Sequence, residues 1–441
     1  MMSLTAQGKR LRPRSGLSMA VPLSVVALLF AGTLAACGGS SNSSGKITLR
    51  FAWWGDATRA KVTQQAVALF EKQHPDITVQ TEYAAYNPYF QKLATETAGG
   101  NAPDLLQMDY RYLNEYGKRG ILLNLNPYMP GTLSLGQFNQ SIAAAGNVSG
   151  QQEAVTFAQN TTAVIYDETR LTALGVPAPP AGWTWPQFQS WAQQVYQRSG
   201  GKLYGTGDMG WAEPVFEQWL IQRGKQLYTP AGQFGFTNAD LAQFWSFWLA
   251  MEKSGAATPA AITAKEDGTP ANSPLPSRTS AADFNYDSVF NGYAAVDSDQ
   301  LAMASFPVVN GSTGQYRKPA MLLSVYAHSP HTQAAVQLLN FLVNDPSAGK
   351  ALGTNRGLPA NLAIRQAIIP QLTSASREVV TYESGVQSQL IATPPAPPEG
   401  DVQVFSLFSR TYQSLVFRRL SLQAAVSQFF SQGSQALASS S

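Results

Sequence analysis

The sequence predicts an α/β protein with two lobes, each a mainly parallel sheet flanked by helices. Residues 47–53, 56–74 and 77–83 have the patterns of a strand, a helix and a strand, an order typical of a βαβ unit with parallel strands. Even without its first 36 residues, the chain keeps 405 of its 441 residues. That length exceeds the roughly 250–300 residues at which one hydrophobic core stops growing, so we expect a second lobe.

The prediction of the first three elements is based on apolar periodicity and on residues typical of helix and strand ends. Residues 47–53 alternate apolar and polar side chains, as a strand with one buried face does. Asp56 suits the N-cap of the helix that follows, and Pro75 ends that helix. Between them the apolar residues recur at helical spacing, so we expect a helix there.

The same patterns predict the later elements, while Pro-rich stretches mark the loops. Residues 255–276 are rich in Ala, Pro, Thr and Gly, and residues 394–398 are almost all proline, so we expect loops at both places. Strands are expected near residues 105–109, 155–157, 164–166 and 320–327, and helices near 89–97, 111–119, from 185, from 213, at 333–344 and over most of 402–437.

The N-terminal segment has the order of an export signal. A basic stretch at residues 9–14 precedes an apolar run at 17–36, and Gly and Ser dominate residues 38–45. This order is that of a signal peptide with a small-residue cleavage site, followed by a flexible tether. The sequence Leu34-Ala35-Ala36-Cys37-Gly38 resembles the lipobox of bacterial lipoproteins, in which the signal is cut before the cysteine and the thiol receives a lipid.

The lipobox resemblance implies a location outside the membrane. It implies that residues 1–36 are a signal peptide, that Cys37 is lipidated, and that residues 37–45 tether the protein to the cell membrane. A leftover thiol after an ordinary signal, or a transmembrane anchor, stays open as an alternative, since about 20 apolar residues suffice to span a bilayer. An intramolecular disulfide is excluded because Cys37 is the only cysteine.

The charge balance argues against a nucleic-acid partner. Four of the 30 Lys and Arg residues lie in the export signal, which leaves 26 basic against 27 acidic residues in the rest of the chain. Nucleic-acid binding proteins carry a strong excess of basic residues, which this chain lacks. Charged residues make up only 13% of the chain and aromatic residues 11%, so we expect aromatic rings on surfaces as well as in the core.

Several segments between residues 46 and 365 carry a family pattern. They are Phe51-Ala52-Trp53-Trp54-Gly55-Asp56, Ala102-Pro103-Asp104 with the following residues to Tyr110, Ile165-Tyr166-Asp167, Gly182-Trp183-Thr184-Trp185-Pro186-Gln187-Phe188, Lys318-Pro319-Ala320-Met321, His328-Ser329-Pro330, Asn344-Asp345-Pro346 and Gly353-Thr354-Asn355-Arg356-Gly357-Leu358-Pro359-Ala360-Asn361. Together these segments resemble the carbohydrate-binding proteins of bacterial ABC importers, the extracellular solute-binding family that includes maltodextrin-binding proteins. The resemblance covers most of residues 46–365, and the chain departs from the family pattern at Asn285-Tyr286-Asp287-Ser288, where many relatives have an aromatic-Ser-Asn-Gln sequence.

This resemblance implies the two-lobed type II periplasmic-binding-protein architecture, with a hinge of crossing segments. It places lobe 1 at residues 46–155 plus about 307–365, and lobe 2 at about 156–306 plus 366–441. A sugar would bind in the cleft between the lobes, and the protein would deliver it to the transmembrane subunits of an ABC permease. We expect a monomeric receptor without enzymatic activity, without a cofactor and without a bound metal.

The expected binding residues lie at the ends of strands. In open α/β sheets, ligands bind beyond the carboxyl ends of the strands, and residues 53–56 and 109–111 occupy such ends. Aromatic rings match the C–H faces of a sugar, and carboxylates match its hydroxyls. The preferred residues are Trp53, Trp54, Asp56, Asp109, Tyr110, Trp211 and Glu213, and the second-rank residues are Arg59, Tyr86, Tyr89, Tyr286 and Asp287.

Each expected contact has a structural alternative. Asp56 and Asp109 could simply cap the helices that follow them, and Glu213 could favour the positive end of its helix. Trp53 and Trp54 point to opposite faces of a strand, so one of the two is expected in the core. Tyr286 and Asp287 could be loop residues.

Two motifs are expected to carry no chemistry. Residues 205–210 fit the pattern Gly-x-Gly-x-x-Gly, but the long preceding strand and the later acidic residue of a dinucleotide site are missing. His328 and His331 are three residues apart, but only His74 could join them, whereas zinc sites use three or four protein ligands. We expect both histidines at the surface near a helix start.

Two other functions stay open at this point. An exported glycosidase needs two carboxylates across a scissile bond, and Asp56, Asp109 and Glu213 could supply them. A receptor for a polyamine, a peptide or an iron complex would have the same two-lobed fold. The Trp-rich strand ends favour a sugar over these solutes.

Overall fold

The computed structural model describes residues 46–266 and 270–439. The predicted signal peptide, the predicted lipid site at Cys37 and the tether lie outside these residues. No helix within the described ranges is both long enough and apolar enough to cross a bilayer.

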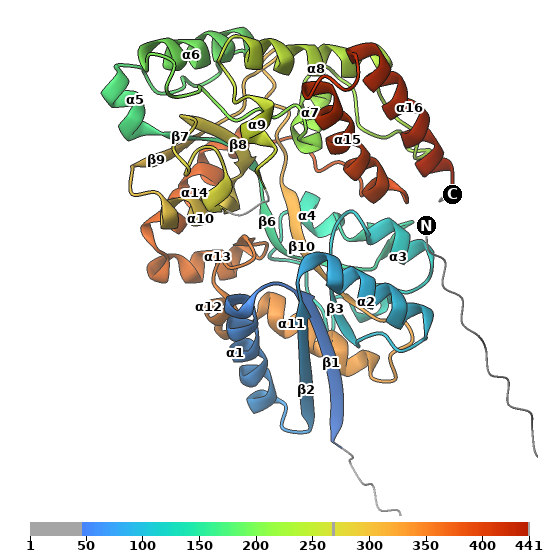
Figure 1. Cartoon of the computed structure of the whole chain (residues 1–441). Helices are drawn as coiled ribbons and strands as arrows, with labels where there is room; N and C mark the ends of the chain where they lie inside the picture. Colours follow the sequence, from blue (N-terminus) through green and yellow to red (C-terminus); the bar gives the residue numbers. More distant parts are fainter. Residues whose placement is uncertain (1–45, 267–269, 440–441) are drawn as a thin grey trace, which may run out of the picture. The chain divides into compact units, whose positions relative to one another are not determined.

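Lobe 1, as we use the term, is the six-stranded sheet with the helices that pack on it. Its strand order is β11-β6-β10-β3-β1-β2, and Figure 1 labels the last five of these strands. Strand β1 pairs in parallel with β2 over its whole length and with β3 near its end, as the βαβ pattern predicts. The strands of the chain are β1 Ile47–Trp54, β2 Ile77–Ala84, β3 Leu105–Met108, β4 Asn147–Val148, β5 Gln151–Gln152, β6 Val155–Asn160, β7 Thr162–Asp167, β8 Ala282–Tyr286, β9 Leu301–Ala304, β10 Lys318–Val325 and β11 Leu358–Pro359.

Lobe 2, as we use the term, is the three-stranded sheet β8-β7-β9 with its helices, and this sheet corrects the prediction of a mainly parallel one. Strand β7 is antiparallel to both of its neighbours. In lobe 1, β10 is antiparallel to β3 and β6, and β11 is antiparallel to β6. A βαβ crossover makes neighbouring strands parallel, but a strand that re-enters a sheet from another lobe is free of that constraint.

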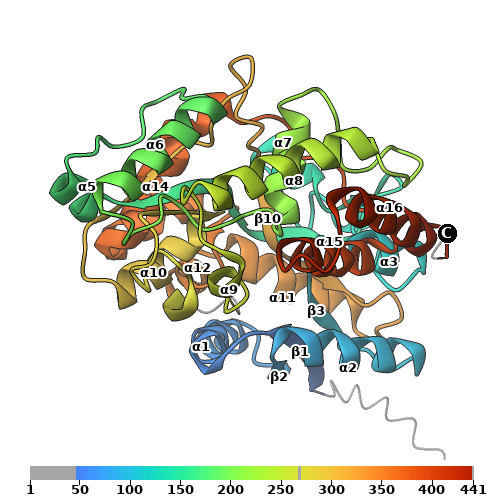
Figure 2. The ribbon, with the colours of Figure 1, turned by 45° about the horizontal axis from the view of Figure 1, so that its top comes forward.

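The helices cover the two sheets and bury a core in each lobe. Figure 2 shows α15 and α16 side by side, with α8 next to them. All three helices belong to lobe 2. The helices are α1 Ala57–Gln73, α2 Tyr86–Ala98, α3 Leu113–Lys118, α4 Gln140–Ala144, α5 Glu168–Leu174, α6 Trp185–Arg198, α7 Glu213–Ile221, α8 Asn238–Lys253, α9 Ala260–Thr263, α10 Phe290–Val296, α11 Thr332–Asn344, α12 Pro346–Leu352, α13 Leu362–Ile368, α14 Ser374–Val386, α15 Asp401–Val416 and α16 Leu422–Ala438.

The core of lobe 2 is built from aromatic rings. Trp185 stacks on Phe284 of the sheet and meets Trp219 and Trp248 edge to face. Each such ring buries about 150–250 Å². Many of the chain's aromatic residues therefore lie in this core.

Helix ends follow the local sequence. Helix α6 begins with a capping box in which the Thr184 side chain accepts from the N–H of Gln187, and Gln187 accepts from the N–H of Thr184. In α1, the Asp56 carboxylate accepts from the N–H of Arg59 at 2.8 Å. Such caps satisfy backbone donors that have no partner inside the helix.

Chain crossings between the two sheets position the site. Strand β6 belongs to the lobe-1 sheet and β7 to the lobe-2 sheet, with only Thr161 between them. The chain returns to lobe 1 at β10, which starts at Lys318 (Figure 1). Residues at these crossings therefore face elements of both lobes.

Candidate functional site

Residues of both lobes enclose a cavity of about 30 Å³, which we call the central cavity. Lobe 1 contributes the residues after β3 and the start of β10, and lobe 2 contributes α7, the end of β8 and the Pro-rich segment before α15. The lining residues are Tyr110, Arg111, Glu213, Pro214, Glu217, Leu227, Tyr286, Tyr316, Lys318, Pro394, Pro395 and Pro397.

Arg111 joins the two lobes through two carboxylates. Its Nη2 donates to Glu213 Oε2 at 2.9 Å, and its Nη1 donates to Asp401 Oδ2 at 2.5 Å. Glu213 is 2% exposed and Asp401 is 1% exposed, so both partners are shielded from water. The guanidinium also lies 4.1 Å from the centre of the Phe405 ring, a cation–π distance.

Burial and charge set the proton affinities of this cluster. Burial alone lowers the pKa of the Arg111 guanidinium, but Asp401 and Glu213 outweigh it and the net shift is upward. Burial raises the pKa of Glu213, which Arg111 opposes. The backbone N–H of Arg111 donates to Asp109 Oδ1 at 2.9 Å, so Asp109 fixes the chain at this point.

A second group of polar residues also lines the central cavity. Tyr316 donates its hydroxyl to Glu217 Oε2 at 2.5 Å, and burial raises the pKa of Glu217 to about 7. The Lys318 ammonium lies 5.0 Å from the centre of the Tyr286 ring. Within the described ranges, no ion pair involves Lys318. Its half-buried ammonium lines the cavity without a carboxylate partner among these residues.

The Pro-rich segment closes the cavity on the side of α3. Tyr110 donates its hydroxyl to the carbonyl of Pro394 at 2.7 Å, and the Asn114 amide donates to the carbonyls of Ala396 and Pro397. Arg119 pairs with Glu399 at 2.5 Å. These contacts join lobe 1 to the residues that lead into α15.

Five of the residues predicted from the sequence lie at or next to the central cavity. Tyr110, Glu213 and Tyr286 line it. Asp109 holds the backbone of Arg111, and Tyr86 donates its hydroxyl to Asp109 Oδ2 at 3.1 Å. Asp109 and Tyr86 therefore position Arg111.

The two tryptophans of β1 are core residues, which corrects their prediction as ligand contacts. Trp53 is 0% exposed and packs on one face of the lobe-1 sheet against Phe51 and Tyr83. Trp54 is 7% exposed and packs on the other face against Tyr86. Helices cover both faces of this sheet, so opposite side-chain directions lead both rings into a core.

Tyr89 and Asp287 are also structural. Tyr89 is 4% exposed and donates its hydroxyl to the carbonyl of Gln107 at 2.7 Å. Asp287 is 1% exposed, and its Oδ2 accepts from the N–H of Thr161 at 3.1 Å, at the crossing from β6 to β7. Both side chains are turned toward backbone groups of the protein, so neither reaches the cavity.

Asp56 and Arg59 serve the start of α1. Asp56 is exposed and caps the helix, which is the structural alternative the sequence left open. Arg59 donates to the side chain of Asn355 at 2.9 Å and to the carbonyl of Trp54 at 3.1 Å. These contacts tie the end of β1 to the turn before β11 and leave neither group at the central cavity.

Trp211 borders a different pocket. Its half-buried ring packs on the lobe-2 core and lines a space of about 150 Å³ together with Glu266 and with Tyr412 and Phe417 near the end of α15. Trp211 and Glu213, which we expected at one site, line different pockets in this structure, although only one residue separates them. Glu213 starts α7 and turns toward Arg111, while Trp211 belongs to the loop before it.

Sequence reasoning missed Asp401, Glu217, Tyr316 and Lys318, and it placed Arg111 at a strand end without naming it as a contact. Arg111 follows a predicted contact directly, and Lys318 opens a segment that carried the family resemblance. The sequence therefore contained a signal for both Arg111 and Lys318. Asp401, 290 residues away from Arg111, had no local signal because only the fold brings the two together.

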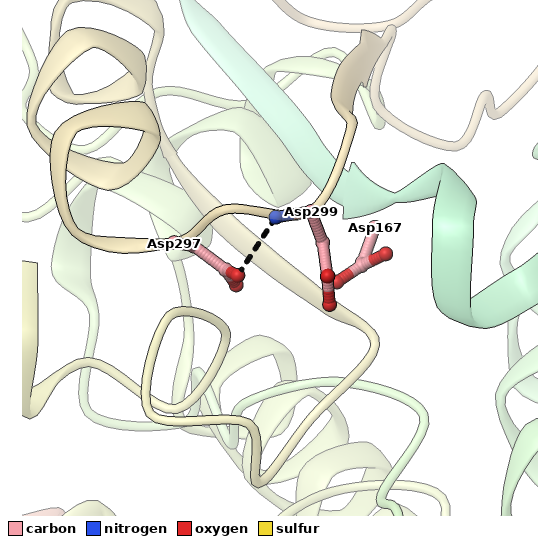
Figure 3. A group of neighbouring side chains, drawn as sticks. All are labelled: Asp167, Asp297 and Asp299. Atoms are coloured by element: carbon pink, nitrogen blue, oxygen red, sulfur yellow. Dashed lines mark hydrogen bonds between the residues drawn. The ribbon is translucent and has the colours of Figure 1, made fainter.

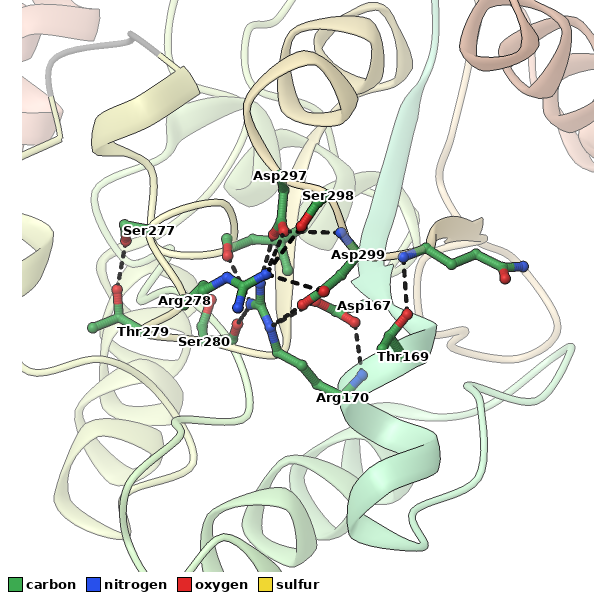
Figure 4. Close-up of polar contacts among 12 residues, drawn as sticks. Asp167, Thr169, Arg170, Ser277, Arg278, Thr279, Ser280, Asp297, Ser298 and Asp299 are labelled. Carbon is green, nitrogen blue, oxygen red and sulfur yellow. Dashed lines mark hydrogen bonds and ion pairs between the residues drawn. The ribbon is translucent and has the colours of Figure 1, made fainter.

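A group of acidic residues in lobe 2 lies apart from the central cavity. Asp167, Asp297 and Asp299 have carboxylate oxygens within 4.8 Å of one another (Figure 3). Arg170 lies among them and pairs with all three, and Arg278 pairs with Asp297 and Asp299 (Figure 4). Burial raises the pKa of Asp167 to about 6, against the effect of Arg170. The two guanidinium groups already pair with all three acids, so the arrangement is an ion-pair network that joins β7 to the start of β9.

The glycine motif and the two histidines make packing and capping contacts. Gly205 and Gly210 of the glycine motif lie where a Cβ atom would meet Ala192 and Tyr412, so they serve close packing. His331 is the N-cap residue of α11, and His328 is exposed beside Tyr326.

Comparison with known proteins gives a family match. Residues 54–349 match the family model described as bacterial extracellular solute-binding protein. A family 1 extracellular solute-binding protein from Alicyclobacillus acidocaldarius is 30% identical with a TM-score of 0.72, over 90% of this chain and 100% of that one. A periplasmic oligogalacturonide-binding protein from Yersinia enterocolitica, solved with saturated digalacturonic acid, is 22% identical with a TM-score of 0.78, over 89% and 99%.

One curated relative of the chain is named as a lipoprotein. It is an uncharacterised lipoprotein of Streptomyces antibioticus, 30% identical over 204 residues, which are 44% of this chain and 41% of that protein. The chain thus spans about two fifths of the length of the curated relatives it matches. The solved structures match over nearly their whole length, so the chain has their two-lobed fold.

Proposed function

The chain belongs to the bacterial extracellular solute-binding proteins, and from that premise we propose that it captures a mono- or oligosaccharide in the central cavity and delivers it to an ABC permease. We propose further that Cys37 carries the lipid that anchors it to the cell membrane. The observation that supports this proposal most is the convergence of charged and aromatic side chains from both lobes on one cavity.

The chemistry of the cavity wall suits a sugar. Tyr110, Tyr286 and Tyr316 offer aromatic faces for C–H groups, and Lys318 and Glu217 offer a donor and an acceptor for hydroxyls. A hydrogen bond to a charged group contributes roughly 1.5–3 kcal/mol. The Yersinia fold neighbour with a bound saccharide supports this choice of ligand class.

Ligand entry requires a change in the distance between the lobes. A cavity of about 30 Å³ holds one or two water molecules by the usual measure. A sugar ring needs several times that space, so the lobes must separate before it binds and close over it afterwards. Closure is then favoured by the ligand's greater affinity for the closed form.

Thermal-shift and calorimetric screening of the chain without residues 1–36 tests this proposal. The panel contains neutral and acidic sugars, amino acids, peptides and polyamines. A ligand at about 100 times its dissociation constant adds about 2.7 kcal/mol to the free energy of unfolding. A response to amino acids, peptides or polyamines with none to any saccharide would contradict it. So would sustained release of reducing ends from an oligosaccharide, which indicates a glycosidase.

The anchor is tested separately in a bacterium that lipidates its exported proteins. The full chain should incorporate labelled fatty acid and fractionate with membranes. Cys37→Ala should abolish both, while leaving a folded protein outside the cytoplasm. Membrane retention of the Cys37→Ala protein would contradict lipid anchoring and favour a transmembrane segment.

A further inference from the structure

We infer that the central cavity takes uncharged sugars and excludes uronic acids, through the placement of its own carboxylates. This inference rests on the proposed function, since it names the kind of saccharide that the same cavity binds. The cavity holds two cations: Arg111, which is paired with two carboxylates of the protein, and Lys318, which shares the cavity wall with Glu217.

The Arg111 guanidinium is the group best suited to bind a sugar carboxylate, but the protein already occupies it. An arginine binds a carboxylate through the parallel N–H groups of its planar fork. In this chain, Nη2 is bound to Glu213 and Nη1 to Asp401, and one face of the guanidinium is covered by Phe405. A uronate could pair with Arg111 only by displacing one of these buried carboxylates.

Among the described residues, neither Glu213 nor Asp401 has a second ion pair that could replace Arg111. Glu213 and Asp401 are almost fully buried, and the Tyr228 hydroxyl, which donates to Asp401 at 2.6 Å, carries no charge. Breaking a buried ion pair by removing one partner is strongly destabilising, because the remaining charge is uncompensated. Glu213 and Asp401 therefore prevent the Arg111 guanidinium from pairing with the carboxylate of a uronic acid.

Lys318 is the second cation, and it shares the cavity wall with an acid. It lines the cavity together with Glu217 and lies over the Tyr286 ring. Burial lowers the pKa of Lys318, but charge interactions outweigh this and the net shift is upward. A ligand carboxylate that approached Lys318 would therefore also approach Glu217.

The number of charged groups at the cavity also disfavours a ligand carboxylate. Glu213, Glu217 and Asp401 face Arg111 and Lys318, so a ligand carboxylate would be a fourth acid against two cations. Like charges in a closed site with little water repel strongly. A neutral sugar meets no such repulsion, because its hydroxyls donate to Glu217 and accept from Lys318 without bringing a charge. Glu217 is therefore the residue that sets this specificity.

Matched sugar pairs test the inference. Calorimetry at pH 8, where Glu217 is ionised, compares galactose with galacturonate, glucose with glucuronate, and galactobiose with digalacturonate. Whichever skeleton binds, the neutral member should bind at least tenfold more tightly than its uronic acid. Glu217→Gln should reduce that ratio several-fold by admitting the acid. The matched control is Glu378→Gln on α14, outside the cavity, which should leave the ratio unchanged.

The outcomes separate the two proposals. Equal or tighter binding of a uronic acid would overturn the inference and leave the saccharide receptor standing. An unchanged ratio in Glu217→Gln would overturn the role of Glu217. Failure of every saccharide to bind would overturn both the inference and the proposed function. Unfolding curves of the two glutamine variants keep a loss of fold from being counted as a loss of specificity.

Discussion

The ends of β1 and β3 lie on neighbouring parallel strands of one sheet, yet they serve different purposes. Trp53, Trp54 and Asp56 at the end of β1 build the core and cap α1. Tyr110 and Arg111 beyond β3 line the central cavity. The next element along the chain makes the difference, since β1 leads directly into a long capped helix. Strand β3 leads into a loop and the short α3, which lets Arg111 reach lobe 2. A strand end is therefore a candidate site only where the next element leaves it free.

The largest expected effect tests the structural side of this comparison. Trp53→Ala removes a ring that is 0% exposed and should lower the free energy of unfolding by about 3–5 kcal/mol. Denaturant unfolding measures the change. A variant that keeps wild-type stability but loses sugar affinity would mean that Trp53 is a ligand contact after all.

The next effect tests the functional side. Arg111→Met leaves Glu213 and Asp401 buried without their cation, which should cost about 3 kcal/mol of stability and abolish sugar binding. Denaturant unfolding and calorimetry measure the two effects. Adding Asp401→Asn removes one of the unpaired charges and should recover part of the stability. If the double variant is less stable than Arg111→Met alone, unpaired buried charge is not the cause of the loss.

A smaller effect separates capping from binding. Asp56→Ala removes the side-chain acceptor of the Arg59 N–H and should cost about 1 kcal/mol of stability. Sugar affinity should stay at the wild-type value in calorimetry, because Asp56 is outside the cavity. A tenfold loss of affinity at unchanged stability would indicate that Asp56 is a ligand contact.

The smallest effect is a pH dependence from Glu217. Burial raises its pKa to about 7 in the folded state, above the usual value for a glutamate, so the folded state holds the proton more tightly. Stability is therefore full at low pH and falls as the pH rises from about 4.5 to about 7. The Glu217→Gln variant should lack this part of the slope in unfolding curves measured across that range. An unchanged slope would assign the pH dependence to other acids, such as Asp208, whose pKa burial raises to about 7.

Local sequence patterns sufficed for much of the fold. The strand predicted at 47–53, the helix at 56–74 and the strand at 77–83 match β1, α1 and β2 to within about two residues. Periodicity and end signals act over a few residues, and so they identify such elements well. Whether a strand pairs in parallel depends on whether the chain enters it from the same lobe or from the other one. Local patterns do not contain this information, so the antiparallel sheet of lobe 2 was not predicted.

The site was predicted only in part, for the same physical reason. Tyr110, Glu213 and Tyr286 have side-chain types and positions that point to binding, and all three line the cavity. Trp53 has equally suitable chemistry, but a helix-covered sheet face buries it. Asp401 was not predicted because its partner Arg111 is 290 residues away in the sequence. Residue type indicates what a group can bind, and the long-range fold decides whether it is free to do so.

One measurement separates the central cavity from the other aromatic sites of the chain. Calorimetry with the saccharide found by screening compares Lys318→Met, at the cavity, with Trp211→Phe, at the pocket beside α15. We predict that Lys318→Met loses most of the affinity and that Trp211→Phe keeps it. Loss of affinity in Trp211→Phe alone, with Lys318→Met unaffected and both proteins folded, would contradict a saccharide site in the central cavity.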